Sequence, residues 1–367
     1  MDSKTLFLHE EIIRNILKRL PVKSLLRFQC VCKQWKNLIK TRSFVADHLH
    51  HFGHRNLSLL LERSPLRLCL LDCRLQLHEV QNAPSSKSVN GAMIVGSCNG
   101  LLSVEINRDK KFPPSLLLWN PANRAFRYVP RRTYSDSNKC EVGFGFSAVA
   151  NDYKIVRTYA KFGDAVNRVE VFSLSRGTWK GIDIGNLKGV KLYAGSVTTN
   201  GAIFWSGLKL GAEEKDDTEV IVSFELAKEV FTLLPRPELD YNASERLTVY
   251  ENKLAMLSNI WDADDESSDW IDLWVMEEGN CASGEGWSWS KIYTSSPCPY
   301  MLYPMTVWRN QIVCEAFPEE DDVKGRHVLY LLNPTTNDAK RFDIPKCGYV
   351  RNMWNYVESL VSLGTYR

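Results

Sequence analysis

The amino-acid sequence predicts a small all-α module of three to four helices, followed by an all-β, propeller-like domain of about six blades. Three observations predict this fold class. Helical periodicity fills the first fifty or so residues, short strands with period-two patterning follow from about residue 95, and two kinds of marker recur about every fifty residues. We place the domain boundaries at residues 1–52 and 53–367.

The helical module is defined by apolar residues at three- and four-residue steps. Those of the first helix are Leu8, Ile12, Ile13, Ile16, Leu17 and Leu20. Pro21 interrupts this helix and suits the first turn of a second, because proline has no amide hydrogen to donate. A third helix follows around Trp35. A unit this small cannot bury all its apolar side chains alone, so some of them contact either the rest of the chain or a partner.

The charge is unevenly divided between the two modules. Residues 1–55 carry eleven Lys and Arg against four Asp and Glu, a net +7, and the remainder carries 35 against 39, a net −4. The basic residues surround every predicted helix, which favours a solvated surface over a nucleic-acid contact. No stretch approaches the roughly 18 apolar residues of a membrane span, and the acidic N-terminus does not resemble an export signal. We therefore expect reduced cysteines and a cytoplasmic or nuclear protein.

The β region repeats with a period of about fifty residues. One kind of turn recurs along the chain at successive steps of 52, 49, 51 and 58 residues. Its first residues are Asn99, Asn151, Asn200, Glu251 and Arg309. One kind of strand likewise recurs at successive steps of 53, 51, 51 and 57 residues. These strands begin at Leu116, Val169, Val220, Ile271 and Val328. Four strands in each period are typical of a propeller blade. We expect residues 56–80 and 354–363 to combine into a blade that closes the ring.

At the N-terminus, the segment from Leu8 to Phe44 resembles a plant F-box almost position by position. The resemblance rests on the tract "ILKRLPVKSLLRFQCVCKQWKNLIKTRSF". It implies docking onto the Skp-type adaptor of a cullin–RING ubiquitin ligase. The adaptor-facing residues that it implies are Leu8, Ile12, Ile16, Leu20, Pro21, Leu25, Leu26, Val31 and Trp35. The sequence departs from the family at His9, where the family has proline after leucine.

The remaining chain is similar to the F-box-associated domain of plant F-box proteins. The similar stretches, within residues 95–345, are "VGSCNGLLSV", "LLLWNPANRAFRYVP", "VGFGFSAVANDYKIVRTY" and "LWVM". That domain is kelch-like, although the glycine pair of true kelch blades is missing. Together the two resemblances imply a substrate-recognition subunit of an SCF-type ubiquitin ligase, which reaches cullin and RING proteins through the adaptor.

The loops between the second and third strands of the blades suggest where a target binds. They point the same way, and three of them are acidic: residues 210–219 carry −4, residues 261–270 carry −5 and residues 318–327 carry −2. Our hypothesis is a target protein with a basic patch. The residues in question are Glu213, Glu214, Asp216, Asp217, Trp261, Asp262, Asp264, Asp265, Glu266, Asp269 and Trp270. The alternative is that these loops are simply solvated and that the tryptophans cap blade edges.

Signals for catalysis are weak. "GSCNG" has Cys98 where a nucleophile elbow has serine, but a strand follows it and not a helix. "GFGF" lacks the helix of a dinucleotide site, and the acidic run at 262–269 lacks the glycine and glutamate of a calcium loop. We therefore expect no catalytic residue, metal or cofactor. The alternatives are a propeller scaffold without ligase coupling, and a propeller hydrolase or lyase with its site at the central channel.

Overall fold

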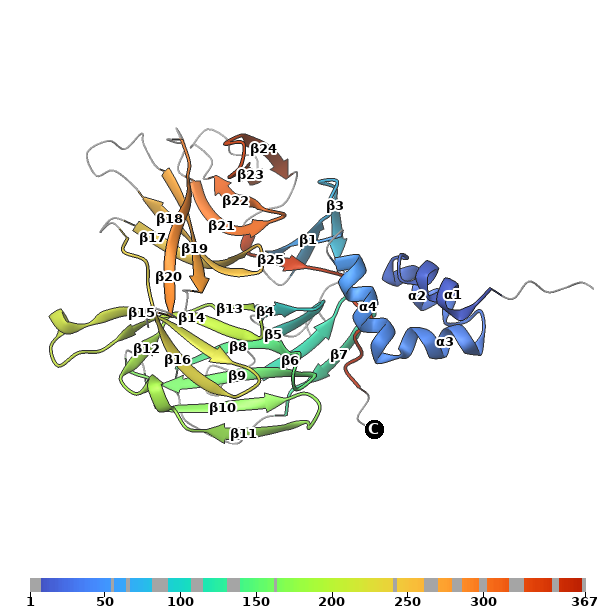
Figure 1. The fold of residues 1–367 in the computed structure, drawn as a ribbon, viewed down its shortest axis with the longest axis horizontal. Helices are drawn as coiled ribbons and strands as arrows, with labels where there is room; N and C mark the ends of the chain where they lie inside the picture. The colour runs from blue at the N-terminus through green and yellow to red at the C-terminus, as the bar shows by residue number, and fades with distance from the viewer. Residues whose placement is uncertain are drawn as a thin grey trace, which may run out of the picture.

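The computed structural model has four helices at one end of a ring of β-sheets (Figure 1). The helices are α1 (Glu10–Leu17), α2 (Val22–Phe28), α3 (Lys33–Lys40) and α4 (Arg42–Gly53). The structure describes residues 8–53, 56–63, 67–80, 92–106, 115–130, 139–161, 164–239, 243–260, 270–278, 286–296, 302–316, 327–344 and 350–364. Among these residues, no helix has both the length and the apolar character that crossing a membrane requires.

Six antiparallel sheets form the blades of the ring, so the predictions of a propeller and of about six blades are confirmed. The strands of blade 1 are β25 (Val350–Tyr356), β1 (Ser58–Arg63), β2 (Arg67–Leu71) and β3 (Leu77–Val80). Those of blade 2 are β4 (Ala92–Cys98), β5 (Leu101–Ile106), β6 (Ser115–Asn120) and β7 (Ala125–Tyr128). Those of blade 3 are β8 (Lys139–Ser147), β9 (Asp152–Ala160), β10 (Arg168–Ser173) and β11 (Thr178–Ile182).

Blade 4 differs from the others because two short strands share the position of its first strand. Its strands are β12 (Val190–Leu192), β13 (Val197–Thr199), β14 (Ala202–Lys209), β15 (Thr218–Glu225) and β16 (Val230–Pro235). Those of blade 5 are β17 (Ala243–Tyr250), β18 (Lys253–Ile260), β19 (Trp270–Glu278) and β20 (Trp287–Thr294). Those of blade 6 are β21 (Leu302–Trp308), β22 (Gln311–Ala316), β23 (His327–Leu332) and β24 (Ala339–Ile344).

The two ends of the ring meet in blade 1. β25 pairs with β1 in antiparallel register, with Leu60 opposite Trp354. The first strands of successive blades then contact one another around the whole ring: β25 with β4, β4 with β8, β8 with β13, β13 with β17, β17 with β21 and β21 with β25. The closing strand begins four residues before the segment 354–363 that the sequence indicated, and it ends at Tyr356. Closure surrounds the first strand of each blade with the first strands of its two neighbours.

The recurring turn markers are tight turns that join the first two strands of the blades. Asn99 and Gly100 have φ of 51° and 76°, and Asn200 and Gly201 have φ of 48° and 73°. Asparagine and glycine adopt positive φ at low cost, which is why these residue types recur. Gly100 has a second reason to be glycine, because a Cβ there would collide with Ser359.

The hydrophobic core is divided among the gaps between neighbouring blades. β6 illustrates the principle, because all of its residues are buried. Leu117 and Trp119 pack toward blade 1, whereas Leu116 and Leu118 pack toward blade 3. A blade strand therefore buries both faces, and its apolar run is continuous where a half-exposed strand would alternate.

Glycines in "GFGF" let the first strand of blade 3 approach blade 4. A Cβ on Gly143 would collide with the ring of Trp205, which is fully buried. A Cβ on Gly145 would lie 2.8 Å from side-chain carbons of both Thr198 and Leu226. These glycines serve close packing between blades, which explains the motif without a nucleotide.

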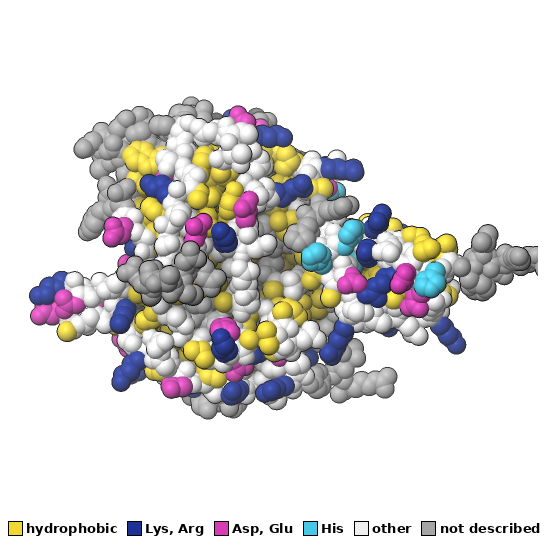
Figure 2. Space-filling view, viewed as in Figure 1, with side chains coloured by type: hydrophobic (Ala, Val, Ile, Leu, Met, Phe, Trp, Pro, Cys, Tyr) yellow, Lys and Arg dark blue, Asp and Glu magenta, His cyan; other side chains and the backbone are white. Residues whose placement is uncertain are grey.

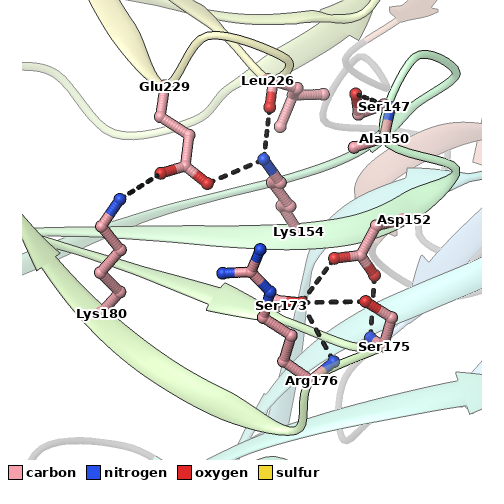
Figure 3. A network of polar contacts seen from close by, with 10 residues as sticks. All are labelled: Ser147, Ala150, Asp152, Lys154, Ser173, Ser175, Arg176, Lys180, Leu226 and Glu229. Atoms are coloured by element: carbon pink, nitrogen blue, oxygen red, sulfur yellow. Dashed lines mark hydrogen bonds and ion pairs between the residues drawn. The ribbon is translucent and has the colours of Figure 1, made fainter.

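Polar contacts also join adjacent blades (Figure 3). Lys154 of β9 is buried, and its Nζ donates to the carbonyl of Leu226 at 2.6 Å and to Glu229 Oε1 at 2.8 Å, both in the turn between β15 and β16. Glu229 Oε2 also accepts from Lys180 Nζ at 3.2 Å. The Trp179 indole donates to the carbonyl of Pro130, at 2.8 Å, on the neighbouring blade. Both blade interfaces thus have directional contacts in addition to apolar packing.

Candidate interaction surfaces

Helix α1 has apolar side chains on two sides. Leu17 is buried and Ile13 is partly buried, and both pack in the hydrophobic cluster of the helices. Ile12 and Ile16 lie on the other side, where they are 48% and 49% exposed, and Leu8 before the helix is 56% exposed. Side chains four residues apart lie on one helix face, so Ile12 and Ile16 lie in one row, and Leu8 precedes the helix as a third exposed apolar residue. We call these three residues the apolar stripe, and Figure 2 shows hydrophobic side chains on the surface of the helices.

The core of the helices is complete without the apolar stripe. Its fully or nearly fully buried members are Leu17, Val22, Leu25, Leu38, Ile39, Phe44 and Leu360. Leu25 has no exposed surface, so its assignment to the adaptor-facing side is wrong: it packs inward from α2. Leu20, Leu26 and Trp35 are half-buried at the edge of this core, while Pro21 and Val31 are exposed.

His48 of α4 connects the helices to one another. Its Nε2 lies 2.9 Å from the carbonyl oxygen of Leu20, so Nε2 carries the hydrogen and donates. The ring stacks on Phe52, with a centroid distance of 5.1 Å. Burial lowers the pKa of His48, and this outweighs the hydrogen bond to Leu20, which raises it. The neutral ring is therefore part of the folded helical module.

The hairpin of β14 and β15 lies at the end of the ring opposite the helices (Figure 1). Its tip holds the short 3-10 helix Glu214–Asp216, and Figure 2 shows charged side chains of both signs there. Glu213, Glu214 and Asp216 are exposed, while Asp217 is half-buried and accepts a 2.8 Å hydrogen bond from the amide of Gly211. The tip of this hairpin and the helices thus lie at opposite ends of the molecule.

The second acidic loop lies outside the described residues, so the expected residues Trp261, Asp262, Asp264, Asp265, Glu266 and Asp269 have no structural account. Trp270 is described and is half-buried at the start of β19. The structure brings four of the expected acidic residues together at the tip of the β14–β15 hairpin. One of the four, Asp217, also stabilises that tip through the hydrogen bond that it accepts from the Gly211 amide.

Comparison with known sequences identifies both parts of the chain. The profile of the F-box associated beta propeller domain matches residues 63–363, and the profile of the F-box domain matches residues 6–46. The chain belongs to the F-box proteins with an F-box-associated propeller. It is 26% identical to a putative F-box protein of Arabidopsis thaliana, over 97% of this chain and 94% of that protein. An F-box/kelch-repeat protein of the same plant is 26% identical, over 84% of each chain.

Solved structures are only distantly similar to this F-box protein. The β-propeller domain of the trilobed protease from Pyrococcus furiosus aligns with a TM-score of 0.39 and 12% identity, over 69% of this chain and 71% of that chain. An oligogalacturonate lyase with manganese aligns with a TM-score of 0.36 and 10% identity, over 79% and 73%. These values are too low to indicate a shared activity.

The enzyme-like motifs of the F-box protein have structural explanations. Cys98 ends β4, and the turn at Asn99 and Gly100 leads into β5, so no helix follows the cysteine. Burial raises the pKa of the Cys98 thiol to about 12, which keeps it protonated and a poor nucleophile. Within the described ranges, no three His, Cys, Asp or Glu side chains are grouped to hold a metal ion.

Sequence reasoning missed one element next to the F-box. Residues 357–364, after the closing strand, run past the turns of blade 2 and contact the helices, and we call them the C-terminal strap. Leu360 in the strap is 8% exposed and belongs to the F-box core. The sequence signal for the strap was its four apolar residues, which we had assigned to the closing blade: Val357, Leu360, Val361 and Leu363.

Proposed function

We propose that this chain is the substrate-recognition subunit of an SCF-type cullin–RING ubiquitin ligase. The observation that carries the proposal is the apolar stripe of Leu8, Ile12 and Ile16. Three large apolar side chains stay about half exposed although the core behind them is complete. Exposed apolar rows of this kind are typical of surfaces that a partner covers, and a Skp-type adaptor is the partner that an F-box implies.

In this proposal the chain performs no chemistry itself. The adaptor links the F-box to cullin and RING proteins, and the far end of the propeller holds the target. Ubiquitin transfer is then faster because target lysines stay close to the conjugating enzyme, which raises their effective concentration. We also propose a cytoplasmic or nuclear location, with which the free cysteines among the described residues are compatible.

Adaptor binding is tested with substitutions in the apolar stripe. The double variant Ile12→Asp with Ile16→Asp should weaken binding to a purified Skp-type adaptor by more than roughly a hundredfold, because each docked isoleucine is replaced by a carboxylate that the interface must desolvate. A matched control is Ile292→Asp on β20, where the side chain is 44% exposed on the propeller. Full binding by the double variant, or no binding by the native chain, would contradict the proposal; the latter outcome favours a scaffold without ligase coupling.

We further propose that the target carries a basic patch, which binds the acidic residues at the tip of the β14–β15 hairpin. Complementary charge at such a surface raises the rate of encounter and fixes orientation more than it adds affinity. The test is affinity capture from cells with the proteasome blocked, followed by mass spectrometry. Replacing Glu213, Glu214, Asp216 and Asp217 by lysine should remove the captured target, and unchanged capture would reject this surface.

A further inference from the structure

The C-terminal strap is held firmly by the propeller. The side-chain amide of Asn120, which is fully buried, donates to the carbonyls of Ser359 and Val361 at 2.9 Å each. Asn123 donates to the same Val361 carbonyl at 3.0 Å. Farther along, Leu363 is 3% exposed in the hydrophobic cluster between blades 2 and 3. The strap is therefore part of the rigid ring.

The same strap also contacts the F-box at three points. Leu360 packs in the F-box core, where it is the one buried residue from outside the helices in the described part of the chain. The Glu358 carboxylate accepts a hydrogen bond from the amide of Val22, at the first turn of α2. Val357 lies against Gly53, the last residue of α4.

These contacts supply the F-box with a hydrogen-bond partner and an apolar side chain that come from the strap. The first amides of a helix have no partner inside the helix, and Glu358 supplies one for α2, although burial of this carboxyl raises its pKa. Leu360 belongs to the same hydrophobic cluster as Val22 and Leu25 of this helix. The apolar stripe lies on α1, so the strap and the stripe occupy different parts of the F-box.

We propose that the C-terminal strap fixes the angle between the F-box and the propeller. Because the strap contacts lie within this chain, they fix the angle whether or not an adaptor is bound. Its consequence for a ligase rests on the function proposed above: a fixed angle holds the target in one place relative to the adaptor and restricts which of its lysines receive ubiquitin.

The angle is measured in the free chain by double electron–electron resonance. Spin labels are attached through non-natural amino acids at two exposed lysines, Lys36 on α3 and Lys188 on the ring. The native chain should give one narrow distance distribution. The double variant Glu358→Ala with Leu360→Ala should broaden it, whereas Leu363→Ala, a control in the same strap that packs only on the ring, should not. A narrow distribution in the double variant, or equal broadening in the control, would overturn the proposal.

Two further readouts separate this proposal from loss of folding and from the proposed function. Ring melting should be unchanged in the double variant, because β25 still closes blade 1. Amide hydrogen exchange in α2 should become roughly fivefold faster in Glu358→Ala, the scale of a lost helix cap, and Glu358→Gln should restore most of the protection. Unchanged exchange would overturn the capping role. Adaptor binding is a separate measurement, and its failure would leave the angle measurement valid.

Discussion

The contact between Lys154 and Glu229 makes a quantitative test of how the blades are held together. The Lys154 side chain is 7% exposed, and only the Leu226 carbonyl and the Glu229 carboxylate bind its ammonium group among the described contacts. In Glu229→Ala the buried charge keeps one neutral acceptor. Breaking a buried pair costs about 3–5 kcal/mol, and we expect about 3 kcal/mol because Glu229 is 21% exposed and water screens it in part.

The matched control lies in the same turn. Glu225 pairs with Lys228 at 3.0 Å, but the two side chains are 44% and 74% exposed. An exposed pair contributes about 0–1 kcal/mol, so Glu225→Ala should lower the free energy of unfolding by no more than about 1 kcal/mol. Urea denaturation followed by intrinsic tryptophan fluorescence measures both variants. A difference between them below about 1 kcal/mol would refute the argument that burial makes the Lys154 pair strong.

The pH dependence of the same pair has a definite sign. Burial raises the pKa of Glu229, but hydrogen bonds and charge from Lys154 and Lys180 outweigh it and hold the pKa below its ordinary value. Because the folded-state pKa is the lower one, the pair stabilises the fold above the unfolded-state pKa of about 4.3, and this stabilisation is lost as the pH falls through the folded-state pKa. The destabilisation by Glu229→Ala should therefore shrink in acid.

Three more predictions concern single residues. Gly143→Ala should lower the free energy of unfolding by about 1–3 kcal/mol, because the new methyl group collides with Trp205, whereas Gly181→Ala has open space and should be near neutral in the same urea titration. Because burial lowers the pKa of His48, the stability of the F-box helices should fall as the pH drops below about 6.5, and His48→Phe should remove this dependence in hydrogen exchange. His9 already has φ of −60°, so His9→Pro should stabilise the chain by about 0.4–1 kcal/mol in thermal unfolding; destabilisation would show that the His9 amide is needed.

Repetition made the ring predictable from the sequence. The tight turns need positive φ, so an asparagine recurs in the turn of each blade from blade 2 to blade 6, as at Asn99 and Asn310. The strand positions follow from the same period. Blade 4 departs from the pattern because its first strand is split into β12 and β13. Gly195, which has a φ of 95°, lies between these two strands, but it does not fall on the fifty-residue period, so the division was not predicted.

Contacts between distant parts of the chain were not predictable. The bond between Asn120 and Ser359 joins residues 239 positions apart, and nothing in either local sequence indicates the other. Leu25 was misassigned because the sequence alone does not distinguish it from its neighbour in α2, Leu26. Only the packing shows that Leu25 points inward while Leu26 stays at the edge. The role of Gly143 likewise depends on Trp205, which lies on another blade.

The most direct test of the account is a calorimetric titration of the native chain with a purified Skp-type adaptor. The account predicts a one-to-one complex with a negative change in heat capacity, because docking buries the apolar stripe of Leu8, Ile12 and Ile16. The heat-capacity change should be smaller in magnitude for Ile16→Ala, which removes part of that apolar surface. Absence of binding by the native chain, or binding whose heat capacity is unaffected by Ile16→Ala, would contradict the central claim.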